Sequence, residues 1–216
     1  MSDLYVNSGF KQATLAPFGP IGIIAHTTNI DFVRKVSDVL SSKRNKRIAD
    51  GRTQYASNPG YARSDYLIDS KLIRFQSGEG KCALGESVRG NDIYIITDVL
   101  AHNGTVKLID GEHVISSDDH YMDLLRIISV CRGKARRINV IMHFVYEGRR
   151  EKLDTRGESY DCADVLKKLY SLGVANLIVF DPHDARIANA VPLMSIEYPR
   201  CQFKLTSALL SKFGSI

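Results

Sequence analysis

Two charged segments follow apolar runs in the second half of the chain. Residues 176–180 lead straight into Asp181-Pro182-His183-Asp184, and the apolar run 137–144 is followed by a charged loop over residues 146–152. If both runs are parallel strands, their carboxyl ends meet at the edge where open α/β sheets bind ligands. The arginines of the loop suit polyphosphate, and the histidine suits a metal ion or a proton. The pattern therefore points first to a site that handles nucleotides.

The arginines of this loop are candidates for binding phosphate. A guanidinium group carries planar, paired N–H donors that match two phosphate oxygens at once. Arg149 is the leading candidate because it follows Gly148, where the backbone can turn closely, and Arg150 stands beside it. The alternative is that Arg149 is an ordinary solvated surface arginine.

His183 is the second candidate. Because it comes directly after Asp181-Pro182, the chain is expected to be extended there and to leave the sheet sharply. The imidazole would bind Mg²⁺ through a water or hydrogen-bond a phosphate, and the alternative is a histidine that only caps local structure. The remaining histidines show no metal-ligand spacing and are expected to be structural: His26, His102, His113, His120 and His143.

A third candidate group surrounds Gly78. Phe75, Ser77 and Glu79 offer an aromatic ring and hydrogen-bonding groups, which is what an adenine edge requires, although a plain β-turn would give the same pattern. The segment is not a P-loop, because Phe75 stands where the first glycine is needed and Cys82 replaces the Ser or Thr that would hold Mg²⁺. No Gly-x-Gly-x-x-Gly pattern follows a strand, so a dinucleotide site is not expected.

Composition narrows the class of protein. The 216 residues fit one large domain or two small ones, and a hydrophobic fraction of 44% is enough for a core without disulfide staples. The four cysteines stand singly, which indicates buried thiols in a reducing compartment. With no signal pattern and no membrane-length apolar run, we expect a soluble cytoplasmic protein. The net charge of +5 favours small phosphorylated ligands over nucleic acid, since no nucleic-acid recognition motif is present.

Hydrophobic spacing predicts alternating strands and helices. Strands are expected at 20–26, 66–68, 72–75, 92–97, 137–144 and 176–180. The two strands at 66–68 and 72–75 are a possible hairpin, and Asn103-Gly104 with Asp110-Gly111 mark an inserted hairpin or loop. The fold class is therefore α/β, a doubly wound and mainly parallel sheet with helices on both faces and a hairpin insertion.

Three helices are expected between these strands. The first follows Thr27-Thr28-Asn29 and ends within residues 41–46, with a core-facing side of Phe32, Val36, Val39 and Leu40. The second is capped by residues 117–119 and faces the core through Met122, Leu125, Ile127 and Ile128. The third covers 161–172 and ends at Gly173, and residues 201–213 are mildly helical.

Five collinear segments resemble ribose-phosphate pyrophosphokinases, also called PRPP synthetases. They are G-E-S-V-R-G-N-D-I-Y-I-I at 85–96, R-R-I-N-V at 136–140, Y-E-G-R-R at 146–150, R-G-E-S-Y-D-C-A at 156–163 and F-D-P-H-D-A-R at 180–186. The last three are similar to the Y-E-S-R-Q, R-E-S-L-D-C-A and F-D-A-H-D-P-R patterns of one branch of that family. The resemblance implies a phosphoribosyltransferase-like fold.

The resemblance also implies an activity, which is pyrophosphate transfer from Mg-ATP to ribose 5-phosphate, giving PRPP and AMP. Arg149 would bind ATP phosphate with Arg150 beside it, and His183 would stand at the metal and the triphosphate. Phe75, Ser77 and Glu79 would hold adenine across a subunit boundary, because members of the family form dimers and hexamers. The implied cofactor is Mg²⁺, and the implied partners are ATP, ribose 5-phosphate and further copies or a related synthetase.

The chain departs from the family pattern in ways that bear on activity. Ser77 stands at the usual Asp of the adenine loop, Arg150 replaces Gln, and Glu151 replaces His. The acidic ribose-phosphate loop and the basic catalytic loop of the family's second half do not occur. We therefore expect residues 1–200 to be an ATP-side N-terminal domain that is inactive alone, and 201–216 to be the start of a missing domain or a loose tail. The alternatives are a non-catalytic regulatory or assembly subunit and a basic α/β domain that binds nucleic acid.

Overall fold

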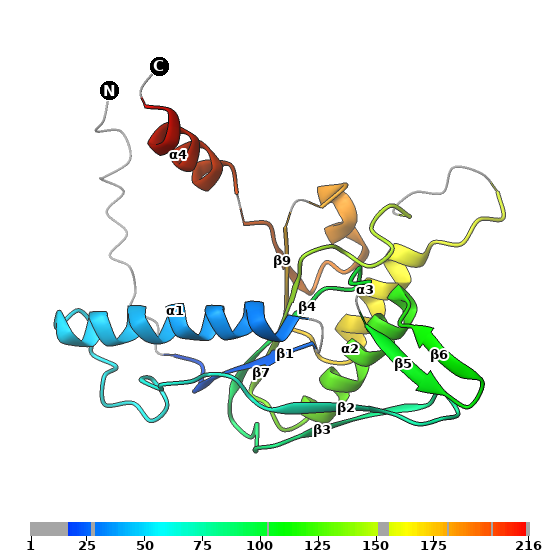
Figure 1. Cartoon of the computed structure of the whole chain (residues 1–216). Helices are drawn as coiled ribbons and strands as arrows, with labels where there is room; N and C mark the ends of the chain where they lie inside the picture. Colours follow the sequence, from blue (N-terminus) through cyan, green and yellow to red (C-terminus); the bar gives the residue numbers. More distant parts are fainter. Residues whose placement is uncertain are drawn as a thin grey trace.

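The computed structural model describes residues 17–26, 29–102, 104–150, 156–180, 182–199 and 201–214. Its centre is a five-stranded sheet in which every neighbouring pair is parallel (Figure 1). In spatial order the strands are β1 (Ile21–Ala25), β4 (Asp92–Thr97), β7 (Arg137–Met142), β8 (Asn176–Val179) and β9 (Ser195–Glu197). The predicted α/β class is confirmed, and β9 is a strand that the sequence pattern missed.

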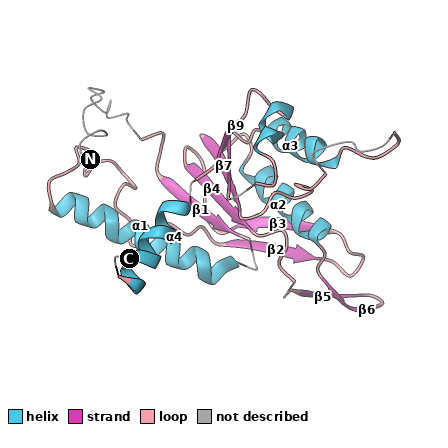
Figure 2. Cartoon of the chain, turned by 90° about the horizontal axis from the view of Figure 1, so that it is seen from above, coloured by secondary structure: helices cyan, strands magenta, loops and turns pink. Residues whose placement is uncertain are grey.

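Helices cover the two faces of the sheet unequally (Figure 2). From β4 onward the chain steps across the sheet in one direction, so α2 (Ser117–Cys131) and α3 (Asp161–Ser171) lie on the same face, as right-handed crossovers require. In contrast, α1 (Ile30–Ala49) leads the other way, to Leu67, which bridges to Ile23 at the outer side of β1. It therefore covers the opposite face. Later in the chain, the described residues also form the 3-10 helix η2 (Ala185–Ala190) and α4 (Gln202–Phe213).

The hydrophobic core is correspondingly larger under α2 and α3. Strand residues such as Ile95, Val140 and Leu177 are fully buried there against Leu124 of α2 and Leu166 of α3. The face under α1 has a smaller cluster: Ile23, Ala25, Val33, Tyr66 and Ile96. The predicted strands read as near-continuous apolar runs because parallel strands of this kind bury both faces.

Two hairpins stand outside the main sheet. The predicted insertion is confirmed as β5 (Thr105–Leu108) paired with β6 (Gly111–Val114). The other predicted hairpin is wrong: β2 (Ser70–Arg74) pairs with β3 (Gly80–Leu84), and residues 66–68 lie beside β1 instead. The error arose because β3 contains no β-branched or aromatic residue and starts with glycine, so its strand signal is weak, whereas Tyr66 and Ile68 are buried apolar residues.

The first helix ends later than predicted, and its predicted face is confirmed at Val36 and Leu40, which pack on the core, but not at Phe32 and Val39. It continues through the polar run to Ala49, and Gly51 follows with a left-handed φ of 63°. Phe32 and Val39 are half exposed, while Ser37 and Ser41 are buried. The buried serines serve the adjoining segment: the Ser37 hydroxyl donates to Asp65 (2.8 Å) and that of Ser41 to the Arg63 carbonyl (2.8 Å). The inward side of α1 therefore combines these serines with Val33, Val36 and Leu40.

The other two helices follow the prediction more closely. The N-cap of α2 is Ser116, one residue earlier than expected, in a capping box with Asp119. Met122 is 45% exposed and does not face the core as expected. Gly173 follows α3 with a φ of 90°, as its position predicted. Among the described residues, none of the helices combines the length and hydrophobicity that spanning a bilayer demands.

A buried polar network fixes the amino-terminal end of the sheet. The Asp92 carboxylate, 4% exposed, accepts bonds from Arg137 Nε (2.8 Å), Arg137 Nη2 (2.5 Å) and Asn139 Nδ2 (2.8 Å). Asn176 on β8 donates in turn to the Asn139 side-chain oxygen (2.6 Å). The network therefore crosses β4, β7 and β8 and aligns the three strands that position the candidate site.

Removing the centre of this network should destabilise the fold. Asp92→Ala leaves the partly buried Arg137 guanidinium without its carboxylate, so we expect the free energy of unfolding to fall by about 3–5 kcal/mol. Urea unfolding measures the loss. The matched control is Asp164→Ala, which removes an exposed partner of Lys167 and should cost less than about 0.5 kcal/mol. Equal losses in the two variants would contradict this reading.

Candidate functional site

The strongest candidate site lies at the carboxyl ends of β7 and β8. The last paired residues of these strands are Met142 and Val179, so the two following loops start side by side. The first loop carries Arg149 and Arg150, and the second carries His183. All three side chains are exposed. The structure thus brings two cations and an imidazole to one edge of the sheet, where ligands of open α/β folds bind.

The loop that carries the arginines is tightly built. Val145 is buried, and its carbonyl accepts a bond from the Gly148 amide (2.9 Å). A Cβ on Gly148 would lie 2.9 Å from that same carbonyl oxygen, so only glycine fits this turn without a shift. Glu147 adopts a left-handed φ of 57°, which is strained for a residue with a side chain. These constraints give the backbone that leads to Arg149 a defined conformation.

Tyr146 fastens the same loop to α2. Its ring stacks on Tyr121 at a centroid distance of 4.6 Å, and its hydroxyl donates to Asp118 (2.5 Å). Burial, and then the bond to Asp118, raise the pKa of Tyr146 above its usual range. The hydroxyl therefore keeps its proton as a donor. Within the described ranges neither Arg149 nor Arg150 forms an ion pair, and the Arg149 guanidinium lies 5.9 Å from the Phe144 ring centroid.

The loop that carries His183 joins an aromatic series at the same edge. The ring centroids of Phe180 and His143 are 6.0 Å apart, and those of His143 and Phe32 of α1 are 5.1 Å apart. Asp184 caps η2 by accepting from the Arg186 amide (2.8 Å), so the chain beyond His183 is fixed. Asp181 lies outside the described residues, as do Glu151 and Lys152 of the first loop. Sequence reasoning treated His143 as structural and missed its place between the two loops.

The predicted adenine residues do not join the other candidates within one chain. Phe75, Ser77 and Glu79 form the tip of the β2–β3 hairpin, closed by the Phe75 amide donating to the Glu79 carbonyl (2.7 Å). The hairpin lies at the base of the molecule, whereas the segment bearing residue 183 lies above the opposite end of the sheet (Figure 1). Phe75 is 47% exposed, and the Ser77 hydroxyl donates to Glu79 Oε2 (3.1 Å). The hairpin tip is thus partly exposed and lies apart from the segment that bears residue 183.

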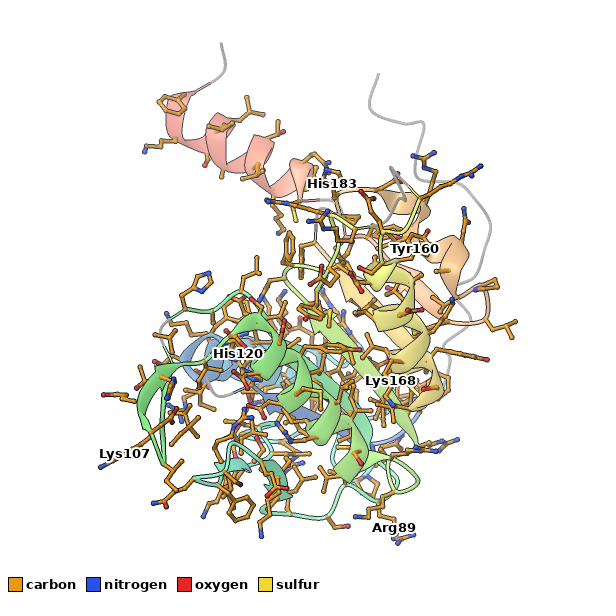
Figure 3. The ribbon with its side chains drawn as sticks, turned by 90° about the vertical axis from the view of Figure 1, so that its right-hand side faces the viewer. Arg89, Lys107, His120, Tyr160, Lys168 and His183 are labelled. Atoms are coloured by element: carbon orange, nitrogen blue, oxygen red, sulfur yellow. The ribbon has the colours of Figure 1, made fainter. Side chains whose placement is uncertain are left out.

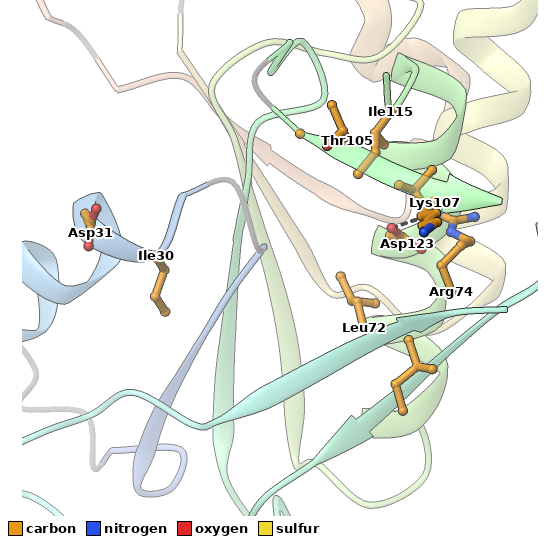
Figure 4. A pocket seen from close by; sticks show the side chains of 11 residues that line it. Ile30, Asp31, Leu72, Arg74, Thr105, Lys107, Ile115 and Asp123 are labelled. Atoms are coloured by element: carbon orange, nitrogen blue, oxygen red, sulfur yellow. Dashed lines mark hydrogen bonds and ion pairs between the residues drawn. The ribbon is translucent and has the colours of Figure 1, made fainter. Parts of the chain in front are cut away.

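Ion pairs hold this hairpin firmly against α2. Arg74 contacts Asp123 (2.9 Å) and Asp119 (3.3 Å), and Arg126 also pairs with Asp123 (2.5 Å). A cavity of about 620 Å³ opens beside them, between the start of α1, β2 and β5 (Figure 4). It contains none of the predicted site residues, and the Arg74 and Asp123 charges on its wall neutralise each other. We therefore assign it no part in the site.

The described side chains do not build a metal site of their own. No group of three or more His, Cys, Asp or Glu side chains within these ranges is arranged to hold an ion. His183 alone is also a poor match for Mg²⁺, which prefers oxygen ligands in an octahedron.

A buried polar group at the ends of β1 and β4 escaped sequence reasoning. His26 and His120 are both fully buried, with their rings edge to face at 4.8 Å. His120 Nε2 lies 2.8 Å from the Ala101 carbonyl oxygen, whereas His120 Nδ1 and Thr97 Oγ1 have no hydrogen-bond partner among the described residues. Only the position of His26 after an apolar run could have signalled this pair.

Comparison with known proteins points to one family. A family model described as the N-terminal domain of ribose phosphate pyrophosphokinase matches residues 21–173. Ribose-phosphate pyrophosphokinase of Parasynechococcus marenigrum is 29% identical over 138 residues, which are 61% of this chain and 38% of that protein. Ribose-phosphate pyrophosphokinase 3 of Saccharomyces cerevisiae is 30% identical over 122 residues, 56% of this chain and 34% of that protein.

The fold has a solved counterpart. The phosphoribosylpyrophosphate synthetase from Mycobacterium smegmatis superposes with a TM-score of 0.65 at 18% sequence identity. The match covers 89% of this chain and 52% of that one. This chain therefore spans about half of the solved relative and at most 38% of the two curated relatives.

The buried histidine pair should make stability depend on pH. Burial, reinforced by His120, lowers the pKa of His26 from 6.5 to about 4. In the unfolded chain His26 binds a proton below pH 6.5, whereas in the folded chain its imidazole stays neutral down to about pH 4. The free energy of unfolding should therefore decrease as the pH is lowered from 6.5 to about 4. His26 should account for up to about 3 kcal/mol of this loss.

Urea unfolding at pH values inside and above the window tests this. His26→Gln should flatten the profile relative to the parent chain, because its side chain cannot titrate. His113→Gln is the matched control, since His113 is exposed on β6. A profile that is as steep in His26→Gln as in the control would contradict the assignment.

Proposed function

Since the chain belongs to the ribose-phosphate pyrophosphokinase family, whose N-terminal domain it matches, we propose that it is the ATP-side half of such an enzyme. The observation that carries the proposal is the meeting of Arg149, Arg150 and His183 at the ends of adjacent parallel strands. Two exposed guanidinium groups on a rigid loop suit a triphosphate, and an imidazole on the neighbouring loop faces the same edge.

The proposed reaction is pyrophosphate transfer from ATP to ribose 5-phosphate. The anomeric oxygen forms a bond to the β-phosphorus, the bond between that phosphorus and the α-phosphate oxygen breaks, and AMP leaves while the hydroxyl proton is lost. Such transfers depend chiefly on positioning and on neutralising charge. Arg149 would hold and neutralise phosphate oxygens, and His183 would hydrogen-bond the triphosphate. Mg²⁺ would enter with ATP as part of the substrate.

Adenine would be held by a second copy of the chain. Phe75 and its hydrogen-bonding neighbours Ser77 and Glu79 project outward on a hairpin that α2 fixes through Arg74. A rigid exposed hairpin of this kind can complete a site on another molecule. We therefore propose a homo-oligomer, or an assembly with a related synthetase, in which each ATP site is shared between two chains.

The chain alone would not synthesise PRPP. Its sequence lacks the acidic ribose-phosphate loop that the resemblance places in the family's second half. Ribose 5-phosphate would therefore bind only where another chain or segment supplies that loop.

One observation favours a second candidate, a non-catalytic regulatory or assembly subunit. The Ser77 hydroxyl donates to Glu79, so a residue at the usual Asp position occupies one oxygen of the carboxylate expected to meet adenine. Such a subunit would keep the assembly surface while the nucleotide site loses function.

Nucleotide titration tests the first proposal. The chain should bind Mg-ATP weakly, at about millimolar concentration, and Arg149→Ala should weaken binding by about tenfold, because a charge-assisted bond is lost. Isothermal titration measures both. Arg89→Ala is the matched control, since Arg89 is exposed at the opposite end of the molecule from His183 (Figure 3) and should bind like the parent chain. Absence of binding, or an unaffected Arg149→Ala variant, would contradict the proposal.

AMP release separates the two candidates. With Mg-ATP and ribose 5-phosphate the chain alone should release no AMP, whereas addition of the separately expressed second half of a relative should restore sugar-dependent AMP. Arg149→Ala and His183→Ala should abolish that restored activity. Co-purification with a full-length relative that is unchanged by Arg149→Ala, without restored activity, would favour the regulatory subunit instead. AMP from the chain alone would overturn the half-enzyme reading.

A further inference from the structure

The tip of the β2–β3 hairpin combines an aromatic ring with two polar groups that differ in hydrogen-bonding capacity. Phe75 is 47% exposed, and Ser77 and Glu79 are exposed as well. A hydroxyl both donates and accepts, whereas an ionised carboxylate only accepts, through two oxygens. The side chains of the tip therefore offer one donor and two acceptor oxygens next to a ring. These groups determine which planar ligand the tip fits best.

Strand pairing places the three side chains on one face of the hairpin. The last paired residues of β2 and β3 are Arg74 and Gly80, so Phe75 lies opposite Glu79, and its amide donates to the Glu79 carbonyl (2.7 Å). Side chains of directly opposite residues project from the same face, with Cβ atoms about 5 Å apart. Because side chains alternate along a strand and that of Arg74 pairs with α2, this face points away from α2. The Ser77 hydroxyl joins the group by donating to Glu79 Oε2 (3.1 Å).

The tip is rigid and open to a ligand. Gly78 turns the chain with a φ of 87°, and its amide donates to the Phe75 carbonyl (2.9 Å). The preceding residue, Arg74, is held by Asp123 of α2 (2.9 Å). Among the described residues, no atom would lie within 4 Å of a Cβ added to Gly78, so the space beside the turn is empty. The ring and the two polar groups therefore keep their relative positions and can be reached from solvent.

Adenine and guanine place different demands on such a tip. A purine that stacks on the Phe75 ring would turn one edge toward the hydroxyl and the carboxylate. Adenine presents an N6–H donor and the N1 acceptor, which match one oxygen of Glu79 and the hydroxyl of Ser77. Guanine presents the O6 acceptor and two donors, N1–H and N2–H, which match the hydroxyl and both carboxylate oxygens. Guanine thus gains one more charge-assisted bond than adenine.

Ser77 is the residue that permits this match. Its hydroxyl and the Glu79 carboxylate already lie side by side, as O6 and N1 do on guanine. When guanine binds, the hydroxyl would turn from Glu79 to O6, and N1–H would take its place at the carboxylate. Every donor keeps an acceptor in this exchange, so no group is left unpaired. A carboxylate at residue 77 would have no proton to donate and would repel O6.

We propose that Ser77 and Glu79 make the nucleotide site selective for guanine over adenine, so that a guanosine triphosphate is its better ligand. The inference rests on the proposed function, in which this hairpin tip meets the base of the nucleotide. Arg149 and His183 would contact the triphosphate, which both nucleotides share. The selectivity therefore comes from the hairpin tip alone.

Isothermal titration of the full chain with Mg-GTP, Mg-ITP and Mg-ATP tests the selectivity. Mg-GTP should bind about fivefold to tenfold more tightly than Mg-ATP, because of the additional bond to the carboxylate. Mg-ITP should lose this advantage, since its base lacks N2–H. Arg149→Ala should weaken Mg-GTP and Mg-ATP by the same factor, because it acts on the shared phosphates.

Two substitutions at the tip locate the source of the selectivity. Ser77→Asp should weaken Mg-GTP about tenfold and change Mg-ATP by less than about twofold. Glu79→Gln should likewise weaken Mg-GTP more than Mg-ATP, because one acceptor oxygen is lost. Ser57→Asp and Glu197→Gln are the matched controls, since they make the same changes of charge at exposed residues outside the hairpin. Circular dichroism should show that all four variants are folded.

The possible outcomes separate this inference from the proposed function. A parent chain that binds Mg-ATP at least as tightly as Mg-GTP would overturn the guanine selectivity and leave the proposed function standing. A preference for Mg-GTP that Ser77→Asp does not change would also overturn it, because the base would then be recognised elsewhere. Failure to bind either nucleotide would overturn both.

Discussion

The parallel pairing of β7 with β4 and β8 is the constraint on which the rest of the structure depends. The pairing sets where the strands end, and so places the arginine loop beside the loop that carries His183. Asp92 enforces it from the other end, because its buried charge must stay within reach of Arg137 and Asn139 on β7. A shift of one residue in the register of β7 would break the hydrogen bonds around Asp92 and would also displace the loops of the candidate site. Stability and site geometry are therefore set by the same register.

The two parts of the candidate site differ in kind. The loop around Arg149 is preorganised, since Gly148 fits closely against Val145 and Tyr146 is clamped to Asp118. The β2–β3 hairpin is equally rigid but points elsewhere, with Arg74 committed to α2. Rigid groups that do not meet within a chain cannot be brought together by a small local motion. The proposal of a site shared between copies is consistent with both observations.

The sequence predicted those elements whose signals are local. The strands at 92–97 and 176–180, the inserted hairpin and the glycine after α3 follow from hydrophobic runs and turn chemistry, and the structure has them there. The resemblance also led to the family that the comparisons show. Pairing across long separations was not readable: the partner of β2, the strand β9 and the His26–His120 contact depend on which segments the fold brings together. The roles of Arg149, Arg150, His183 and the hairpin tip stay predictions, because geometry shows proximity and exposure but not a bound nucleotide.

The predicted face of α1 is only half correct, and the difference is informative. Val36 and Leu40 pack on the core as predicted, whereas Phe32 and Val39 are half exposed. Ser37 and Ser41 take inward positions instead, through hydrogen bonds to the adjoining segment. An apolar stripe that its own chain leaves half exposed, next to strand residues that are also partly exposed, is what an assembled surface looks like before assembly. The exposed side of α4 repeats the pattern. The separation of the arginine loop from the hairpin tip is consistent with the proposed assembly, in which a second molecule completes the site.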